Sequence, residues 1–298
     1  MTATLDAPVQ DRVADSTAAP TADRRAGMAH RARWLRPGLI ISALWLVLVL
    51  LAAAAPGLLT GRDPYAVDPA ALLQPPSPVH PFGTDQIGRD LFSRVIHGSA
   101  LSLQATLIAV AVGVVVGGAI GLLSAFAGGW LDAVLMRGMD VLMAIPGLLL
   151  SLALIIALGF GTVNVAIAVG FGSVASCARV MRSEALRVKV STYVEAATSL
   201  GVRPLTVVLR HVLPNSVGPV LVLAALDFGT ALLAVSSLSF LGYGAKPPTP
   251  EWGSLVSAGR DFLDTGWWLT TMPGLVVVAS VLAANRIARA LERTERAA

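Results

Sequence analysis

The sequence predicts an all-α membrane protein with six transmembrane helices. Its 298 residues are 55% hydrophobic but only 13% charged. Two long segments, 98–131 and 141–178, contain no Asp, Glu, Lys or Arg. A hydrocarbon core about 30 Å thick requires roughly 20 apolar residues per helix, and runs of that length recur along the chain. Apolar runs this long would make a protein insoluble outside a membrane, so the class of water-soluble proteins is excluded.

The six spans are predicted from these apolar runs. The first covers residues 39–57. Segment 98–131 holds one long span with its flanks, and segment 141–178 holds two, broken near the glycine-containing turn at 159–164. The fifth runs from His211 to about Phe240, and the last covers 270–286.

The segments outside the spans complete the expected domain organisation. Residues 1–36 are polar and show no apolar period, which predicts a disordered tail. We expect no cleavable signal peptide in this segment, because the first apolar run starts too late and is too long. Residues 37–98 form the first span and an extracytoplasmic segment. Residues 99–292 form a five-helix core that contains a polar loop at about 183–210, and residues 293–298 form a short tail.

The basic residues predict the orientation. With both termini placed in the cytoplasm, inner segments hold 17 of the 22 Lys and Arg residues. Cytoplasmic loops carry an excess of Lys and Arg, so this topology is favoured over its inverse. The same distribution explains the basic composition without nucleic acid, and the chain shows no RNA- or DNA-binding motif.

Motifs of enzyme chemistry are missing from the sequence. Lys189 and Lys246 are the two lysines, and neither ends a Gly-Lys-Ser/Thr phosphate-binding loop. There is no Gly-x-Ser-x-Gly or His-Glu-x-x-His pattern. The four histidines lie far apart in sequence, which disfavours a metal site. We therefore expect no catalytic residue and no cofactor. A secondary transporter remains the rival class, but the inverted repeats typical of that class are not evident.

The polar loop between the fourth and fifth spans is the most informative segment. Residues 191–200 are typical of a short helix. Gly201 is suited to a left-handed turn that ends it, and Pro204 to opening a second short helix. A helix–Gly–helix element held between two spans is a compact knob that can dock another protein.

This loop resembles the cytoplasmic coupling loop of ABC importer permeases. The resemblance rests on Glu195-Ala196-Ala197, on Gly201 four residues later and on the membrane context. It implies that the loop transmits ATPase motion through a set of motif residues. They are Tyr193, Glu195, Ala196, Ala197, Gly201, His211, Leu213 and Pro214.

A second motif follows the first span, on the outer side. It contains a polar turn and a Gly-bounded ion-pair candidate, Arg89 with either Asp85 or Asp90, before the next helix. The motif residues are Gly83, Thr84, Asp85, Gly88, Arg89 and Asp90. This segment resembles the signature of the C-type permease subunit of the dipeptide/oligopeptide/nickel importer family. Segments 135–146 and 239–261 resemble the same family, and the resemblance extends over residues 36–292.

The resemblance implies a type I ABC importer permease in the bacterial inner membrane. Such a subunit pairs with a homologous B-type permease, two ATPase subunits that bind ATP and Mg, and an external solute-binding protein. Alternating access would then be driven from the ATPases. Short peptides are the expected cargo, and nickel or a metal chelate is the alternative. A secondary transporter would leave the coupling loop unexplained.

Two features within the spans have open interpretations. Gly113, Gly117 and Gly121 recur at four-residue spacing, which allows close helix packing. That packing could be intrachain, or it could line the pore or a subunit interface. Asp227 is a carboxylate inside the fifth span, where a charge is costly. It either faces the translocation path or the partner permease, or makes a structural polar contact near the outer boundary.

The orientation can be tested by thiol labelling in intact cells. The variants Asp6→Cys, Ser191→Cys and Ala297→Cys should be shielded from a membrane-impermeant reagent, because their segments are predicted to be cytoplasmic. Ser77→Cys should react. Labelling of Ser191→Cys from outside would reverse the topology.

Overall fold

A computed structural model describes residues 37–295, and this part of the chain is helical, with one isolated β-bridge between Thr84 and Asp90. The tail expected at 1–36 and the last residues, 296–298, lie outside the described residues. The chain divides into two compact units between Ile41 and Ser42. The first contributes only residues 37–41 to the description, so the following paragraphs concern residues 42–295.

Six long or bent helical segments account for the predicted spans. The helices are α2 (Pro37–Ala54), α3 (Leu91–Ala127), α4 (Gly129–Ala144), α5 (Gly147–Leu158), α6 (Thr162–Lys189), α7 (Thr192–Ser199), α8 (Pro204–Val207), α9 (Leu213–Phe240), α10 (Trp252–Gly259) and α11 (Trp268–Glu295). Short 3-10 turns lie at Pro56–Leu58 (η1), Pro69–Ala71 (η2) and Arg260–Phe262 (η4). Within residues 37–295, five helical segments are long and apolar enough to cross a membrane, and the bent pair α4–α5 makes a sixth if it counts as one span.

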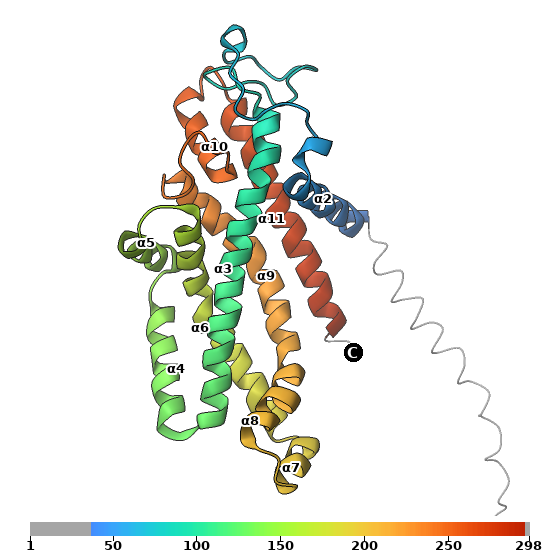
Figure 1. Ribbon diagram of the computed structural model, residues 1–298, viewed down its shortest axis with the longest axis vertical. Helices are drawn as coiled ribbons and strands as arrows, with labels where there is room; N and C mark the ends of the chain where they lie inside the picture. The colour runs from blue at the N-terminus through green and yellow to red at the C-terminus, as the bar shows by residue number, and fades with distance from the viewer. Residues whose placement is uncertain (1–36, 296–298) are drawn as a thin grey trace, which may run out of the picture. The chain divides into compact units, whose positions relative to one another are not determined.

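The core is built on the close approach of α3 and α6, which run side by side over much of their length (Figure 1). The glycine stripe of α3 makes this approach possible. A Cβ at Gly117 would lie 2.5 Å from the carbonyl oxygen of Val174 and 2.7 Å from Cys177 Cβ. Gly113 and Gly121 face α6 in the same way. Of the two interpretations of the stripe, the structure supports packing within the chain.

The third span differs from a straight helix. α4 and α5 meet at an angle of 99°. The bend lies at Ile145, whose extended backbone (φ −90°, ψ 127°) precedes Pro146. Proline disfavours the helical conformation of the residue before it, which explains the position of the bend. The break expected near 159–164 is confirmed, since α5 ends at Leu158 and α6 begins at Thr162.

The prediction of a second short helix at Pro204 was wrong in its length. α8 continues through a π-helical turn, η3 (Val208–Val212), directly into α9, so that Pro204–Phe240 forms one candidate span. The expected start of the fifth span at His211 was therefore too late. Pro214 explains the local widening, because proline clashes with the carbonyl four residues earlier in a regular α-helix.

Some predicted segment boundaries also differ from the helix ends in the structure. α3 begins at Leu91, capped by the Asp90 carboxylate, which accepts a hydrogen bond from Ser93 N at 2.8 Å. The last helix extends beyond 270–286, to Trp268–Glu295. The boundaries proposed at residues 98 and 293 therefore fall inside α3 and α11 and do not mark the ends of elements.

The glycine packing predicts a large difference between two Gly→Ala variants. Gly117→Ala should destabilise the fold by about 1–3 kcal/mol, because the added methyl group meets the backbone of α6. Gly138→Ala in α4 is the matched control. Nothing lies within 4 Å of its added Cβ, so its stability should be unchanged or slightly higher. Thermal unfolding in detergent, followed by circular dichroism, measures both. Equal unfolding temperatures for the two variants would contradict this account.

Candidate functional site

The predicted knob is formed by α7 and the turn that follows it. Gly201 has a φ of 77°, which confirms the expected left-handed conformation. Its N–H donates to the carbonyl of Thr198 at 3.0 Å, and Val202 N–H donates to that of Ala197 at 3.2 Å. These two bonds form a Schellman motif, which satisfies carbonyls at the end of α7. The chain thus reverses at a fixed angle before Pro204 begins the next helix.

Buried valines hold the knob against the ends of two spans. Val194 of α7, Val207 of α8 and Val212 of η3 lie in one apolar cluster. The other buried members of the cluster are Ala125 of α3 and Ala185 and Val188 of α6. Both parts of the coupling motif therefore share one small core.

Lys189 adds a polar link between the same helix ends. Its ammonium lies over the Phe126 ring, 5.1 Å from the ring centroid, and donates to the carbonyl of Ala125 at 3.1 Å. Ala125 is in the last turn of α3. A cation is favourable at this position, because the helix dipole places partial negative charge there.

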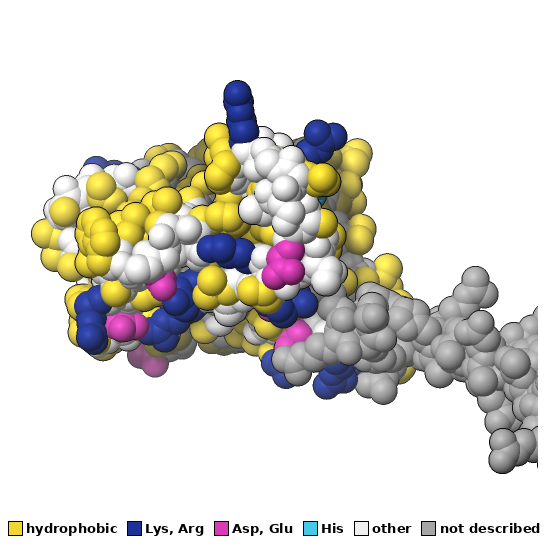
Figure 2. Space-filling model, turned by 90° about the horizontal axis from the view of Figure 1, so that it is seen from below, with side chains coloured by type: hydrophobic (Ala, Val, Ile, Leu, Met, Phe, Trp, Pro, Cys, Tyr) yellow, Lys and Arg dark blue, Asp and Glu magenta, His cyan; other side chains and the backbone are white. Residues whose placement is uncertain are grey.

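The opposite face of the knob is open to the surroundings. Leu200 is 84% exposed, Leu205 68% and Tyr193 47%. Glu195, Ala196 and Gly201 are also exposed, and Ala197 is half-buried. Of the remaining motif residues, His211 and Leu213 are half-buried and Pro214 is exposed. Figure 2 looks onto this end of the molecule and shows charged side chains set among hydrophobic ones. Several exposed apolar side chains around one acid indicate a docking surface.

Two ion pairs beside the knob connect α4 to α6. Arg182 donates two hydrogen bonds of 2.6 Å to the Asp132 carboxylate, which also accepts from Ser124 at the end of α3. Arg179 pairs with Asp140. Sequence analysis missed these pairs, because their members lie 50 and 39 residues apart. They join α4 to the helix that carries the knob.

The motif at residues 83–90, which the sequence predicts to lie on the outer side, folds into a buried polar network. Arg89 Nε lies 2.6 Å from Asp85 Oδ2, so the ion pair that the sequence left open is the one with Asp85. Asp85 also accepts from the backbone N–H groups of Ile87 and Arg89. Gly83 and Gly88 have positive φ values, and the Thr84 carbonyl accepts from Trp268 Nε1 at 3.1 Å. The network thereby attaches the outer segment to α11.

Asp90 and Arg94 extend this network. Besides capping α3, Asp90 lies 2.8 Å from His80 Nδ1 and 3.2 Å from Arg62 Nη1. Arg94 is buried and donates to the carbonyls of Pro64 and Pro248. The start of α3 is therefore linked to both outer segments.

Glu251 is a buried residue whose role the sequence did not reveal. Its carboxylate caps α10 by accepting from the N–H groups of Gly253 and Ser254, and it also accepts from Ser102 Oγ of α3. Burial raises the pKa of Glu251, although these donors act against that shift. The sequence signal for this capping role is an acidic residue directly before Trp252, which is the first residue of α10. Glu251 joins α10 to α3 on the side of the molecule opposite the knob.

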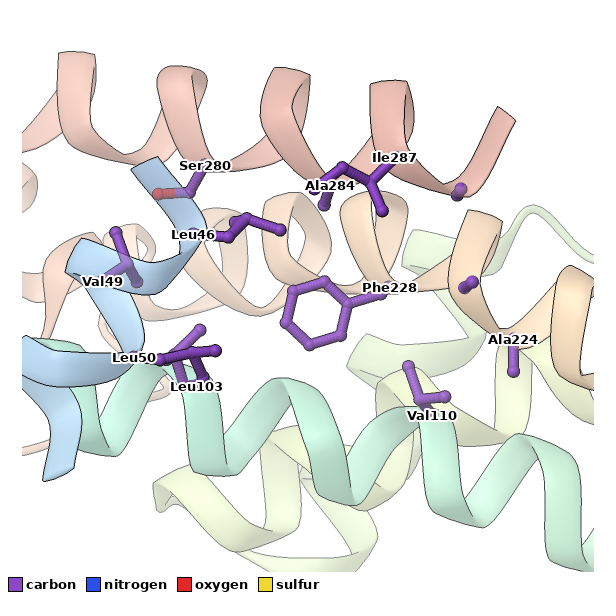
Figure 3. A pocket seen from close by; sticks show the side chains of 12 residues that line it. Leu46, Val49, Leu50, Leu103, Val110, Ala224, Phe228, Ser280, Ala284 and Ile287 are labelled. Carbon is purple, nitrogen blue, oxygen red and sulfur yellow. The ribbon is translucent and has the colours of Figure 1, made fainter. Parts of the chain in front are cut away.

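A cavity of about 390 Å³ lies between α2, α3, α9 and α11 (Figure 3). Its lining is apolar, and the Phe228 ring projects into it. Ser280 is the one residue with a polar side chain in the lining. Its Oγ donates to the carbonyl of Val276 and accepts from Trp45 Nε1. The cavity therefore offers no free polar group to a charged ligand.

Asp227 does not line this cavity. It lies in the middle of α9 rather than near the end of that helix, and it is half-buried. Its carboxylate lies near the hydroxyl group of Ser173 of α6. α3 approaches the same point, since a Cβ at Gly113 would lie 2.9 Å from Ser173 Cβ.

Comparison with known sequences finds a family of membrane transport components and several transport system permease proteins. Residues 113–297 match the family model described as a binding-protein-dependent transport system inner membrane component. The probable D,D-dipeptide transport system permease protein of Escherichia coli K12 is 40% identical over 84% of each chain. The glutathione transport system permease protein of Pectobacterium atrosepticum is 38% identical over 85% of each chain. A putative peptide transport system permease protein of Brucella suis is 40% identical over 86% of this chain and 85% of its own.

Two solved structures share the fold. One, of the MetNI methionine ABC transporter, covers 66% of this chain and 96% of its own, with a TM-score of 0.51 at 16% identity. The other, of an amino acid ABC transporter, covers 68% and 95%, with a TM-score of 0.52 at 17% identity. The predicted fold class, a helical membrane protein with the type I ABC importer permease fold, is confirmed.

The outer network predicts that removing the charge of a buried acid destabilises the protein, whereas removing the charge of an exposed acid does not. Asp85→Asn leaves Arg89 and Arg94 without their counter-charge, which should destabilise the outer segment by about 3 kcal/mol or more. Asp261→Asn is the control, because Asp261 is 75% exposed and pairs only with the exposed Arg260. The rate of trypsin cleavage near the exposed Arg62 measures the effect. Cleavage of Asp85→Asn no faster than that of the control would contradict the structural role.

Proposed function

The chain belongs to the family of binding-protein-dependent transport system inner membrane components, and we propose that it is the C-type, pore-forming permease subunit of an ATP-driven importer of short peptides. The observation that carries this proposal is the knob formed by α7, with its buried anchors and its exposed apolar face. Such an element suits an ATPase subunit that docks from the cytoplasm.

The energy would come from partner subunits. No phosphate-binding loop occurs in the sequence, so ATP and Mg would be bound and hydrolysed on two separate ATPase subunits. The remaining partners would be a homologous B-type permease and an external solute-binding protein. The α7 end would face the cytoplasm, as the distribution of basic residues favours.

The relatives support peptides as cargo. Their names refer to D,D-dipeptide, glutathione and peptide transport, and all of these are short peptides or peptide-like molecules. No observation on this chain favours nickel or a metal chelate over them.

The geometry provides a route for motion from the knob to the outer end. The knob shares its core with the ends of α3 and α6, so displacement of α7 displaces both helices. The segment Pro204–Phe240 is about 55 Å long at 1.5 Å per residue, enough to cross a bilayer. At its far end, Ser236 and Ser239 pack against Gly253 of α10. ATPase closure would therefore move inner and outer ends together, as alternating access requires.

Two substitutions in the knob test this function in the reconstituted complex. Glu195→Lys reverses the charge on the exposed face. Gly201→Val places a branched side chain at a positive φ, which costs roughly 1 kcal/mol or more and misdirects the turn. Both should leave the spans folded but reduce substrate-stimulated ATP hydrolysis and peptide uptake several-fold.

Matched controls separate coupling from general damage. Glu195→Gln keeps the size without reversing the charge. Gly201→Asn tolerates the left-handed conformation better, so both controls should retain most of the coupling. The external binding protein should bind peptide equally in all cases. Normal coupling in both Glu195→Lys and Gly201→Val would exclude the knob as the transmission element.

A further inference from the structure

The exposed faces of two spans differ in chemistry. Helix α2 exposes large apolar side chains, as expected for contact with lipid; among them are Leu44, Val47, Leu50 and Leu51. α6 instead exposes or half-exposes small and polar residues at helical spacing, namely Gly172, Ser173, Ser176, Arg179 and Ser183. Polar residues in a membrane span face a cavity or a protein partner rather than lipid. This face of α6 is therefore not a lipid-facing surface.

The neighbouring edge of α9 continues the polar face. Asp227 is half-buried at the contact with Ser173 of α6, and Thr230, one turn further along α9, is exposed. We call Ser173, Ser176, Asp227 and Thr230 the α6–α9 seam. Leu233, three residues beyond Thr230 on α9, is an exposed apolar residue, so the seam is a short polar strip within a largely apolar span.

Asp227 is the acidic residue of this seam. Within residues 37–295, none of the ion pairs includes Asp227, and the polar side chain near its carboxylate is the hydroxyl group of Ser173. Charged groups at membrane depth are costly and are normally satisfied by a partner. A carboxylate that is partly exposed, in the middle of a span and without a paired cation among residues 37–295 is suited to a cation from outside the chain.

We propose that the α6–α9 seam lines the translocation path and that the Asp227 carboxylate binds the α-ammonium group of the passing peptide. The inference rests on the peptide cargo of the proposed function. An α-ammonium carries the charge that the carboxylate lacks, and the hydroxyl group of Ser176 can hydrogen-bond to peptide groups nearby. Thr230 Oγ1 donates to the Asp227 backbone carbonyl, so it can accept from a peptide N–H. The apolar cavity of Figure 3 is unsuited to this task, because its lining offers no free polar atom.

The test uses the complete importer in proteoliposomes, with the binding protein saturated with a dipeptide. Asp227→Asn keeps the shape of the side chain and removes its charge, whereas Asp227→Glu keeps the charge. Thr270→Val in α11 is the control outside the seam, since it changes polarity in a span without changing charge. Uptake rate, its dependence on the concentration of loaded binding protein, and stimulated ATP hydrolysis are measured for each variant.

Asp227→Asn should lower the maximal uptake rate at least tenfold, and Asp227→Glu should retain at least a third of it. Thr270→Val should stay within about twofold of the unmodified rate. The half-saturating concentration of binding protein and the stimulation of ATP hydrolysis should change little, because neither docking nor the knob involves the middle of α9.

Three results would overturn the inference: unchanged uptake in Asp227→Asn, equal loss in the Asn and Glu variants, or loss of ATPase stimulation together with uptake. The last two would assign Asp227 a structural role. A complex whose unmodified form hydrolyses ATP but transports no peptide would overturn the proposed cargo, and the ammonium site with it. The rate of the unmodified complex therefore reports on the function, and the ratio of variant to unmodified rates reports on Asp227.

Discussion

The close contact between α3 and α6 is the constraint on which the rest of the structure depends. Glycines on one face of α3 let its backbone lie against the carbonyl groups of α6. Helices in lipid gain no hydrophobic driving force from association, so van der Waals packing at such a contact is a main source of stability. Both helices end beside the knob, and α9 packs on the pair. The position of α7 is therefore set by this contact.

The two ends of the molecule are organised by different physical means. At the end opposite the knob, buried ion pairs and backbone caps hold loops that have little apolar surface of their own. Asp85, Asp90 and Glu251 each accept several hydrogen bonds there. At the knob, a few valines provide the anchoring, and the exposed face remains available to a partner. The segment opposite the knob is thus held by hydrogen bonds and ion pairs. The knob is held only on the side that packs against α3 and α6.

Much of this could be predicted from sequence because the signals are local. Apolar run length gave the spans, and Gly201 marked the left-handed turn. The long-range pairs could not be predicted in this way, since Arg182 and Asp132 meet only once α4 packs on α6. The choice between Asp85 and Asp90 as partner of Arg89 depended on loop geometry. The 99° bend at Pro146 and the continuity of α8 with α9 were missed, because proline can end a helix, bend it or be accommodated by a wider turn.

The π-turn at Val208–Val212 has a geometric consequence for the whole of α9. A π-turn amounts to one additional residue in an α-helix, and one residue corresponds to about 100° of rotation around the axis. The turn therefore sets the rotational phase of every later side chain relative to α7. With a regular α-helix in its place, Asp227 would point away from Ser173, and the flat surface at Gly229 would no longer meet Asn285 of α11. One widened turn beside Pro214 decides which side of the helix faces which neighbour.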